Sequence, residues 1–110
     1  MTEFTGKTAL VTGASRGIGA ATAIALAKAG CGRVLIHYCL EEAGARQTFA
    51  AVEAAGAKAE LLFGDLSTDA GIAAFLDVLA PHASGVDMLV NNAGSLVERA
   101  KLAAFTPALF

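Results

Sequence analysis

Residues Thr12–Gly19 read TGASRGIG and follow directly on the short apolar run Ala9–Val11. A strand that turns straight into a helix presents free backbone N–H groups and the positive end of the helix dipole, and both attract anions. Glycine lets such a turn be tight, lets the backbone approach a pyrophosphate, and lets the helix pack closely on the strand. The glycines that we expect to meet these three needs, in this order, are Gly13, Gly17 and Gly19.

The spacing of these glycines is G-x-x-x-G-x-G, which differs from the G-x-G-x-x-G dinucleotide pattern and from the G-x-x-x-x-G-K-[ST] P-loop. The chain has one Gly-Lys-Thr, at residues 6–8, but Met1 stands where the P-loop pattern needs its first glycine, which argues against a nucleoside triphosphatase of the P-loop class. Taken alone, TGASRGIG also fits a tight strand-to-helix turn that holds no ligand.

Strands and helices are expected to alternate along the rest of the chain. The predicted strands are Lys7–Thr12, Arg33–Tyr38, Ala59–Phe63 and Val86–Val90. The predicted helices span residues 17–29, 41–55 and 68–80, with Pro81 and Gly85 closing the last of them. Units of this kind indicate βαβ crossovers. We therefore predict an α/β fold, a Rossmann-type doubly wound parallel sheet of strand order 3-2-1-4, formed by one domain that covers residues 1–110.

A second unusual stretch, Asn91–Gly94 (NNAG), directly follows the fourth predicted strand. In the order 3-2-1-4, the first and fourth strands flank the topological switch point, where ligands bind at the carboxyl ends of the strands. Both stretches are therefore predicted to lie at the same crevice.

Composition excludes several functional classes. The formal net charge of −2 gives no basic footprint for nucleic acid. The longest apolar stretch, residues 17–27, contains Thr22 and ends at Lys28, and it is shorter than the roughly 18–20 residues of a membrane span. Cys31 and Cys39 lack the spacing of a metal site or a disulfide framework. We expect no metal and no membrane contact, two buried thiols and a cytoplasmic location.

Three stretches together, TGASRGIG at 12–19, GDL at 64–66 and VNNAG at 90–94, resemble the N-terminal half of the short-chain dehydrogenases/reductases. Reductases of the 3-oxoacyl-carrier-protein type are the most similar in these stretches. The resemblance covers essentially the whole chain. It implies an NAD(P)-dependent oxidoreductase that acts on a small carbonyl or alcohol substrate. It also implies a homo-oligomer, since members of the family commonly form dimers or tetramers.

The resemblance also implies roles for individual positions. The three glycines match the cofactor turn, and Ser15 and Ile18 match contacts around the pyrophosphate. Asp65 matches the acid that accepts from the adenine amino group, although a turn or helix-capping role is open for it. The remaining matched positions are Leu66, beside the adenine ring, and Asn92, Ala93 and Gly94, along the cofactor ribose. For Asn91 and Asn92, a role in tying the sheet together is also open.

The sequence favours NADP(H) over NAD(H). NAD-selective relatives carry an acid at the end of the second strand, where this chain has His37, Tyr38 and Cys39. The first acids, Glu41 and Glu42, come at the start of the following helix, where we expect no repulsion of a 2′-phosphate. Arg16 offers that phosphate a charge-assisted hydrogen bond. A solvated surface role is open for Arg16, and a purely structural one for His37.

The hydride-transfer residues of the family are not found in this chain. They include a Tyr-x-x-x-Lys pair, but Tyr38 is the one tyrosine here and Glu42 stands four residues after it. We assign no catalytic residue and expect the 110-residue chain by itself to be inactive. Thr106 and Pro107 form a helix start signal with three residues after it. This pattern predicts that the chain is cut inside a further helix, before a fifth strand.

Overall fold

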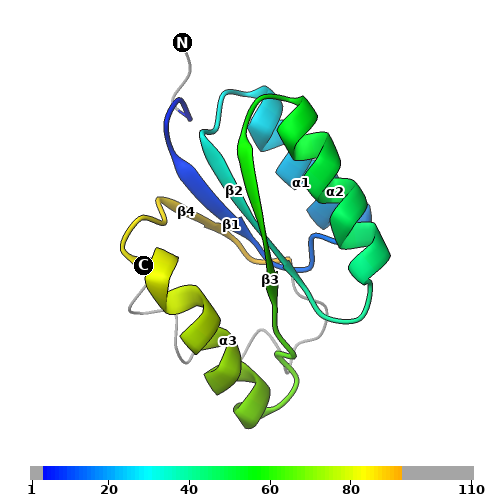
Figure 1. Ribbon diagram of the computed structural model, residues 1–110, viewed down its shortest axis with the longest axis vertical. Coiled ribbons are helices and arrows are strands. Elements are labelled where there is room, and N and C mark those ends of the chain that lie inside the picture. The colour runs from blue at the N-terminus through cyan, green and yellow to red at the C-terminus, as the bar shows by residue number, and fades with distance from the viewer. Residues whose placement is uncertain (1–3, 93–110) are drawn as a thin grey trace.

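The computed structural model describes residues 4–92 of the chain. The elements follow one another as strand, helix, strand throughout this part (Figure 1). In order they are β1 (Thr8–Val11), α1 (Gly17–Lys28), β2 (Arg33–Tyr38), α2 (Glu42–Ala54), β3 (Lys58–Phe63), α3 (Asp69–Ala83) and β4 (Met88–Val90). Every strand and helix predicted up to residue 90 is present, with ends that differ by at most three residues.

The four strands form one parallel sheet in the order β3-β2-β1-β4, which confirms the predicted fold. At the centre of the sheet, Leu10 of β1 lies level with Leu35 of β2 on one side and Leu89 of β4 on the other. The chain thus moves outward from β1 to β3 and then crosses back to β4. The switch point lies where these two directions diverge, at the carboxyl end of β1.

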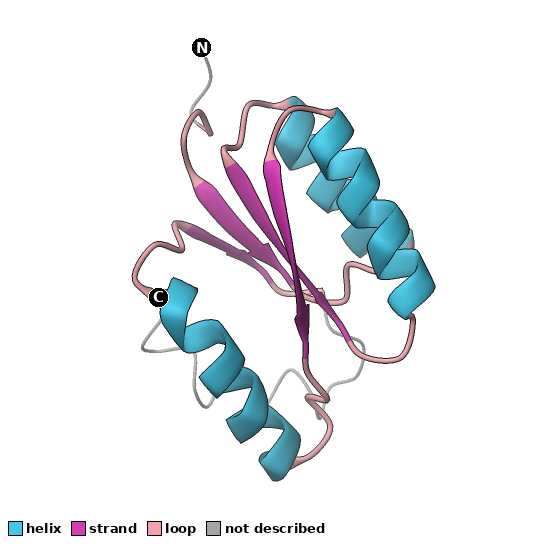
Figure 2. Ribbon diagram, viewed as in Figure 1, coloured by secondary structure: helices cyan, strands magenta, loops and turns pink. Residues whose placement is uncertain are grey.

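Helices cover both faces of the sheet: α1 and α2 lie on one face and α3 on the other (Figure 2). Successive strand residues point to opposite faces, so each strand supplies both cores. In β1, for example, Val11 packs with the α1 and α2 side, while Leu10 packs with the α3 side. Burial on both faces explains why the strands have nearly continuous apolar sequences.

Small side chains let α1 lie close to the sheet. The buried residues of α1 are Gly19, Ala23 and Ala27, spaced four apart along one face of the helix. α2 buries Ala45, Thr48 and Val52 in the same way. The high apolar content with few aromatic residues therefore reflects close helix–sheet packing.

The predicted end of the third helix is corrected. Pro81 lies inside α3, which continues to Ala83. Proline removes one hydrogen-bond donor, but it stands in the last turn, so that a single intrahelical bond is lost. The backbone N–H of Gly85 then donates to the carbonyl of His82, and the N–H of Val86 donates to that of Ala83.

The expected helix start at Thr106 and Pro107 lies outside the described residues. Within residues 4–92, none of the helices combines the length and the apolar character that a transmembrane helix requires.

Leu79 and Val78 of α3 provide a matched test of the core on this face. Leu79 is 1% exposed and Val78 is 43% exposed. We expect Leu79→Ala to lower the free energy of unfolding by about 2–5 kcal/mol, because it removes buried atoms and leaves a cavity. Val78→Ala should change it by about 0.5 kcal/mol or less. Urea denaturation followed by circular dichroism measures both, and equal losses would contradict the packing of α3.

Candidate functional site

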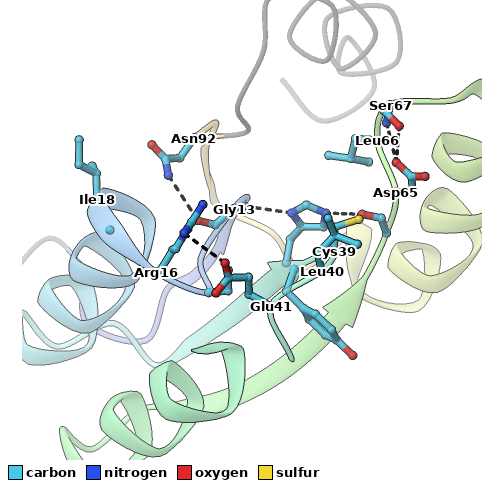
Figure 3. Close-up of a pocket in the computed structure, with 15 residues that line it drawn as sticks. Gly13, Arg16, Ile18, Cys39, Leu40, Glu41, Asp65, Leu66, Ser67 and Asn92 are labelled. Carbon is cyan, nitrogen blue, oxygen red and sulfur yellow. Dashed lines mark hydrogen bonds and ion pairs between the residues drawn. The ribbon is translucent and has the colours of Figure 1, made fainter. Parts of the chain in front are cut away.

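A pocket of about 620 Å³ opens at the carboxyl edge of the sheet (Figure 3). Its walls come from the loops that follow β1, β2, β3 and β4. The lining residues are Gly13, Ser15, Arg16, Gly17, Ile18, His37, Tyr38, Cys39, Leu40, Glu41, Gly64, Asp65, Leu66, Ser67 and Asn92. All predicted site residues that the structure describes are among them except Gly19. Ala93 and Gly94 lie outside the described residues.

The turn after β1 depends on two glycines with positive φ. Gly13 has φ +63° and Gly17 has φ +60°, a conformation that is costly for other residues. A Cβ on Gly13 would lie 3.0 Å from the backbone oxygen of Asn92, whereas a Cβ on Gly17 would meet no atom within 4 Å. Gly17 therefore leaves open space at the start of α1, on the wall of the pocket.

Gly19 has a packing role and does not line the pocket. A Cβ at this position would overlap the backbone oxygen of Gly13 and lie 2.7 Å from the side-chain nitrogen of Asn92. The first turn of α1 can approach the end of β1 this closely because no side chain intervenes. This approach sets the N-terminus of α1 at the pocket wall.

Thr12 and the two asparagines join β1 to β4. The backbone N–H of Asn92 donates to Thr12 Oγ1 over 2.8 Å, and Thr12 Oγ1 donates to Asn91 Oδ1 over 3.3 Å. Asn92 Nδ2 donates to the carbonyl of Gly13. The sheet-tying role that the sequence left open for the asparagines is thus present, and Thr12 is a partner that sequence reasoning missed.

His37 uses both ring nitrogens on backbone groups. The N–H of Gly13 donates to Nδ1 over 2.9 Å, and Nε2 lies 2.8 Å from the carbonyl oxygen of Gly64. An accepting Nδ1 requires the proton on Nε2, so the ring is neutral. The ring is buried and makes an edge contact with Phe75. His37 thus joins the ends of β1, β2 and β3. Both ring nitrogens serve the structural role that the sequence left open for this residue.

Arg16 precedes the first turn of α1 and forms an ion pair with Glu41. Arg16 Nη1 lies 3.2 Å from Glu41 Oε1, with the side chains 79% and 46% exposed (Figure 3). The sequence-based expectation that no acid would affect a phosphate here is corrected, because the Glu41 carboxylate lies in the pocket beside the arginine. The first turn of α1 itself contains no acidic residue.

Contacts from α2 that the sequence reading missed place Glu41 at this position. A Cβ on Gly44 would overlap the carbonyl oxygen of Ser15, so a glycine lets α2 approach the loop after β1. Four residues along α2, Thr48 Oγ1 donates to the carbonyl of Ala14 over 2.8 Å. These two contacts hold the start of α2 against the glycine turn.

Asp65 organises the turn between β3 and α3. Its Oδ1 accepts from the backbone N–H of Ser67 over 3.0 Å and from Ser67 Oγ over 2.6 Å. Thr68 then caps α3, since its hydroxyl accepts from the N–H of Gly71. The turn role left open for Asp65 is therefore present in the structure, while Leu66 beside it lines the pocket and packs with the α3 core.

The two cysteines differ in environment. Cys31 is buried, and this burial raises the pKa of its thiol. Cys39 is only partly buried and lines the pocket, which corrects the expectation that both would be buried. With Leu40, Glu41, Gly64 and Ser67, Cys39 completes the lining residues that the sequence reading did not select.

Comparison with known proteins gives a match of residues 7–108 to the sequence model of the short chain dehydrogenase family. Glucose 1-dehydrogenase 2 of Bacillus subtilis is 39% identical over 92 residues, 84% of this chain and 35% of that protein. A 3-oxoacyl-[acyl-carrier-protein] reductase of Synechocystis is 38% identical over 94 residues, 86% of this chain and 38% of that protein.

Among solved structures, a putative dehydrogenase from Burkholderia cenocepacia with bound NADP superposes with a TM-score of 0.72 at 33% identity, over 80% of this chain and 34% of that one. The chain therefore spans well under half the length of these relatives.

Replacing His37 tests its bridging role. We expect His37→Leu to lower the free energy of unfolding by about 2–5 kcal/mol, because the N–H of Gly13 and the carbonyl of Gly64 each lose a buried partner. His82, which pairs with Glu60 at 3.0 Å, provides the control. His82→Leu should cost about 1 kcal/mol or less. Urea titrations in which the two variants lose equal stability would refute the bridge.

Proposed function

Because the chain belongs to the short-chain dehydrogenase family, we propose that its pocket binds a nicotinamide dinucleotide, NADP(H) in preference to NAD(H). The dinucleotide would serve hydride transfer between its nicotinamide ring and a carbonyl or alcohol substrate of the whole protein. The observation that carries the proposal is the uncapped N-terminus of α1, which opens into a pocket at the switch point of the sheet.

The start of α1 fits a pyrophosphate. Arg16 occupies the N-cap position without a side-chain hydrogen bond to the helix, and the first turn has no acid to compete with an anion. The first N–H groups of a helix have no partners within it, and here the open space over Gly17 gives a phosphate access to them. The pocket volume of about 620 Å³ lies within the range of small-molecule sites.

The two ends of the pocket suit the two ends of a dinucleotide. Asp65 and Leu66, after β3, would take the adenine, while Asn92, after β4, would lie along the nicotinamide side. The adenosine ribose would then lie over the end of β2, next to Tyr38 and Arg16. A 2′-phosphate on that ribose is within reach of the arginine, and the NADP-bound relative from Burkholderia cenocepacia supports this assignment.

The bound nicotinamide ring supplies the hydride chemistry. The residues of this chain bind and orient the dinucleotide, and none is assigned to proton transfer. Tyr38 has Glu42 four residues after it in place of the lysine that lowers the pKa of a catalytic tyrosine.

Arg16→Ala tests the preference for NADP(H). We expect NADPH affinity to fall about ten- to a hundredfold, because a charge-assisted hydrogen bond to the 2′-phosphate is lost. NADH affinity should barely change. Fluorescence titration of each reduced cofactor measures both constants. Arg46→Ala is the control, since Arg46 is also exposed but pairs with Glu42 and lies outside the pocket lining. Equal losses for NADPH and NADH in Arg16→Ala would contradict the preference.

Cys39 reports occupancy of the pocket without any substrate. We expect NADPH to slow the reaction of Cys39 with N-ethylmaleimide, because the cofactor would cover the end of β2. Cys31 should react slowly throughout, since its raised pKa leaves less thiolate and its side chain is buried. Peptide mass spectrometry after timed labelling separates the two sites. An unchanged Cys39 rate at saturating NADPH would argue that the dinucleotide binds elsewhere.

A further inference from the structure

Two adjacent acids at the start of α2 have different partners. The Glu41 carboxylate lies in the pocket, 3.2 Å from Arg16. The Glu42 carboxylate lies 2.7 Å from Arg46, four residues along the same helix, and Glu42 is not part of the pocket lining. One acid therefore supports its own helix, while the other holds the arginine that faces the pocket.

The backbone of Glu41 is held beside the pocket by contacts that do not involve the ion pair. It occupies the N-cap position of α2 but makes no capping hydrogen bond. The start of α2 is held against the glycine turn by the close approach of Gly44 to Ser15 and by the hydrogen bond from Thr48 to Ala14. If Arg16 turned toward a phosphate, the backbone of Glu41 would remain where it is.

The geometry points to Glu41 as a residue that sets cofactor selectivity, an inference that rests on the proposed function. The Glu41 carboxylate competes with the 2′-phosphate of NADP(H) for Arg16, and its negative charge remains within one Debye length of that phosphate. Toward NAD(H) the same carboxylate is favourable, because it can accept a hydrogen bond from the ribose 2′-hydroxyl. The Arg16–Glu41 pair thus reduces the preference for NADP(H) over NAD(H) that Arg16 alone would give.

An exposed ion pair of this kind is weak, so the pair can open when a phosphate arrives. NADP(H) can then bind despite the repulsion between the Glu41 carboxylate and the 2′-phosphate. A chain with Arg16 and no acid at position 41 would discriminate more strongly between the two cofactors, while a chain with the acid accepts both.

The test compares Glu41→Gln with Glu42→Gln. Both substitutions remove one negative charge from adjacent, exposed positions, so their effects on net charge and on the dipole of α2 are matched. We expect Glu41→Gln to tighten NADPH binding about three- to tenfold and to weaken NADH binding, since the ribose 2′-hydroxyl loses a charged acceptor. Glu42→Gln should change either constant by less than about twofold. Fluorescence titrations of NADPH and NADH at low and high salt give the constants, and salt should reduce the effect.

The outcomes separate the inference from the proposed function. If the wild-type chain binds NADPH and the two glutamine variants change the NADPH-to-NADH ratio equally, the role of Glu41 is refuted while cofactor binding stands. If the wild-type chain binds neither cofactor, the proposed function fails and the inference fails with it. A rise in the ratio confined to Glu41→Gln supports the inference.

Discussion

The close approach of α1 to the ends of β1 and β4 is the constraint on which the site depends. Gly19 packs against the carbonyl of Gly13 and the side chain of Asn92 with no room for a Cβ. Because α1 begins so near the strand ends, its first N–H groups face the switch point of the sheet. A larger residue at position 19 would push the helix away and would remove the feature that makes this edge attractive to an anion.

The polar contacts around this edge also join the strands. His37 links the turn after β1 to the end of β3, and Thr12 links β1 to the segment after β4. These hydrogen bonds satisfy backbone N–H and C=O groups at the pocket edge that would otherwise lack a protein partner. The edge is therefore held in one arrangement in part by residues that also line the pocket, such as His37 and Asn92, and preorganisation of this kind favours binding.

The sequence predicted the fold well because the decisive signals were local. Apolar strands, helices of small residues and a glycine-rich turn each follow from neighbouring residues, and their alternation implies a parallel sheet, for which 3-2-1-4 is one of the common strand orders. Glu41 could not be placed in this way, because its position depends on how closely Gly44 lets α2 approach Ser15, which is a tertiary contact. The bond from His37 to Gly64 depends likewise on the register of β2 with β3. Pro81 stands in the last turn of α3, where it removes one intrahelical bond, so the general rule that proline ends a helix places the end of α3 too early by three residues.

The proposed binding of a dinucleotide at the carboxyl edge of the sheet is tested most directly by NADPH titration of the ¹⁵N-labelled chain, followed by amide NMR. A chain of 11.0 kDa suits this measurement. We predict that the shifted amides of residues 4–92 will cluster after β1, β2, β3 and β4, with the largest changes at Gly17 and Ile18 at the start of α1. The absence of shifts at millimolar NADPH, or shifts concentrated on the outer face of α3, would contradict it.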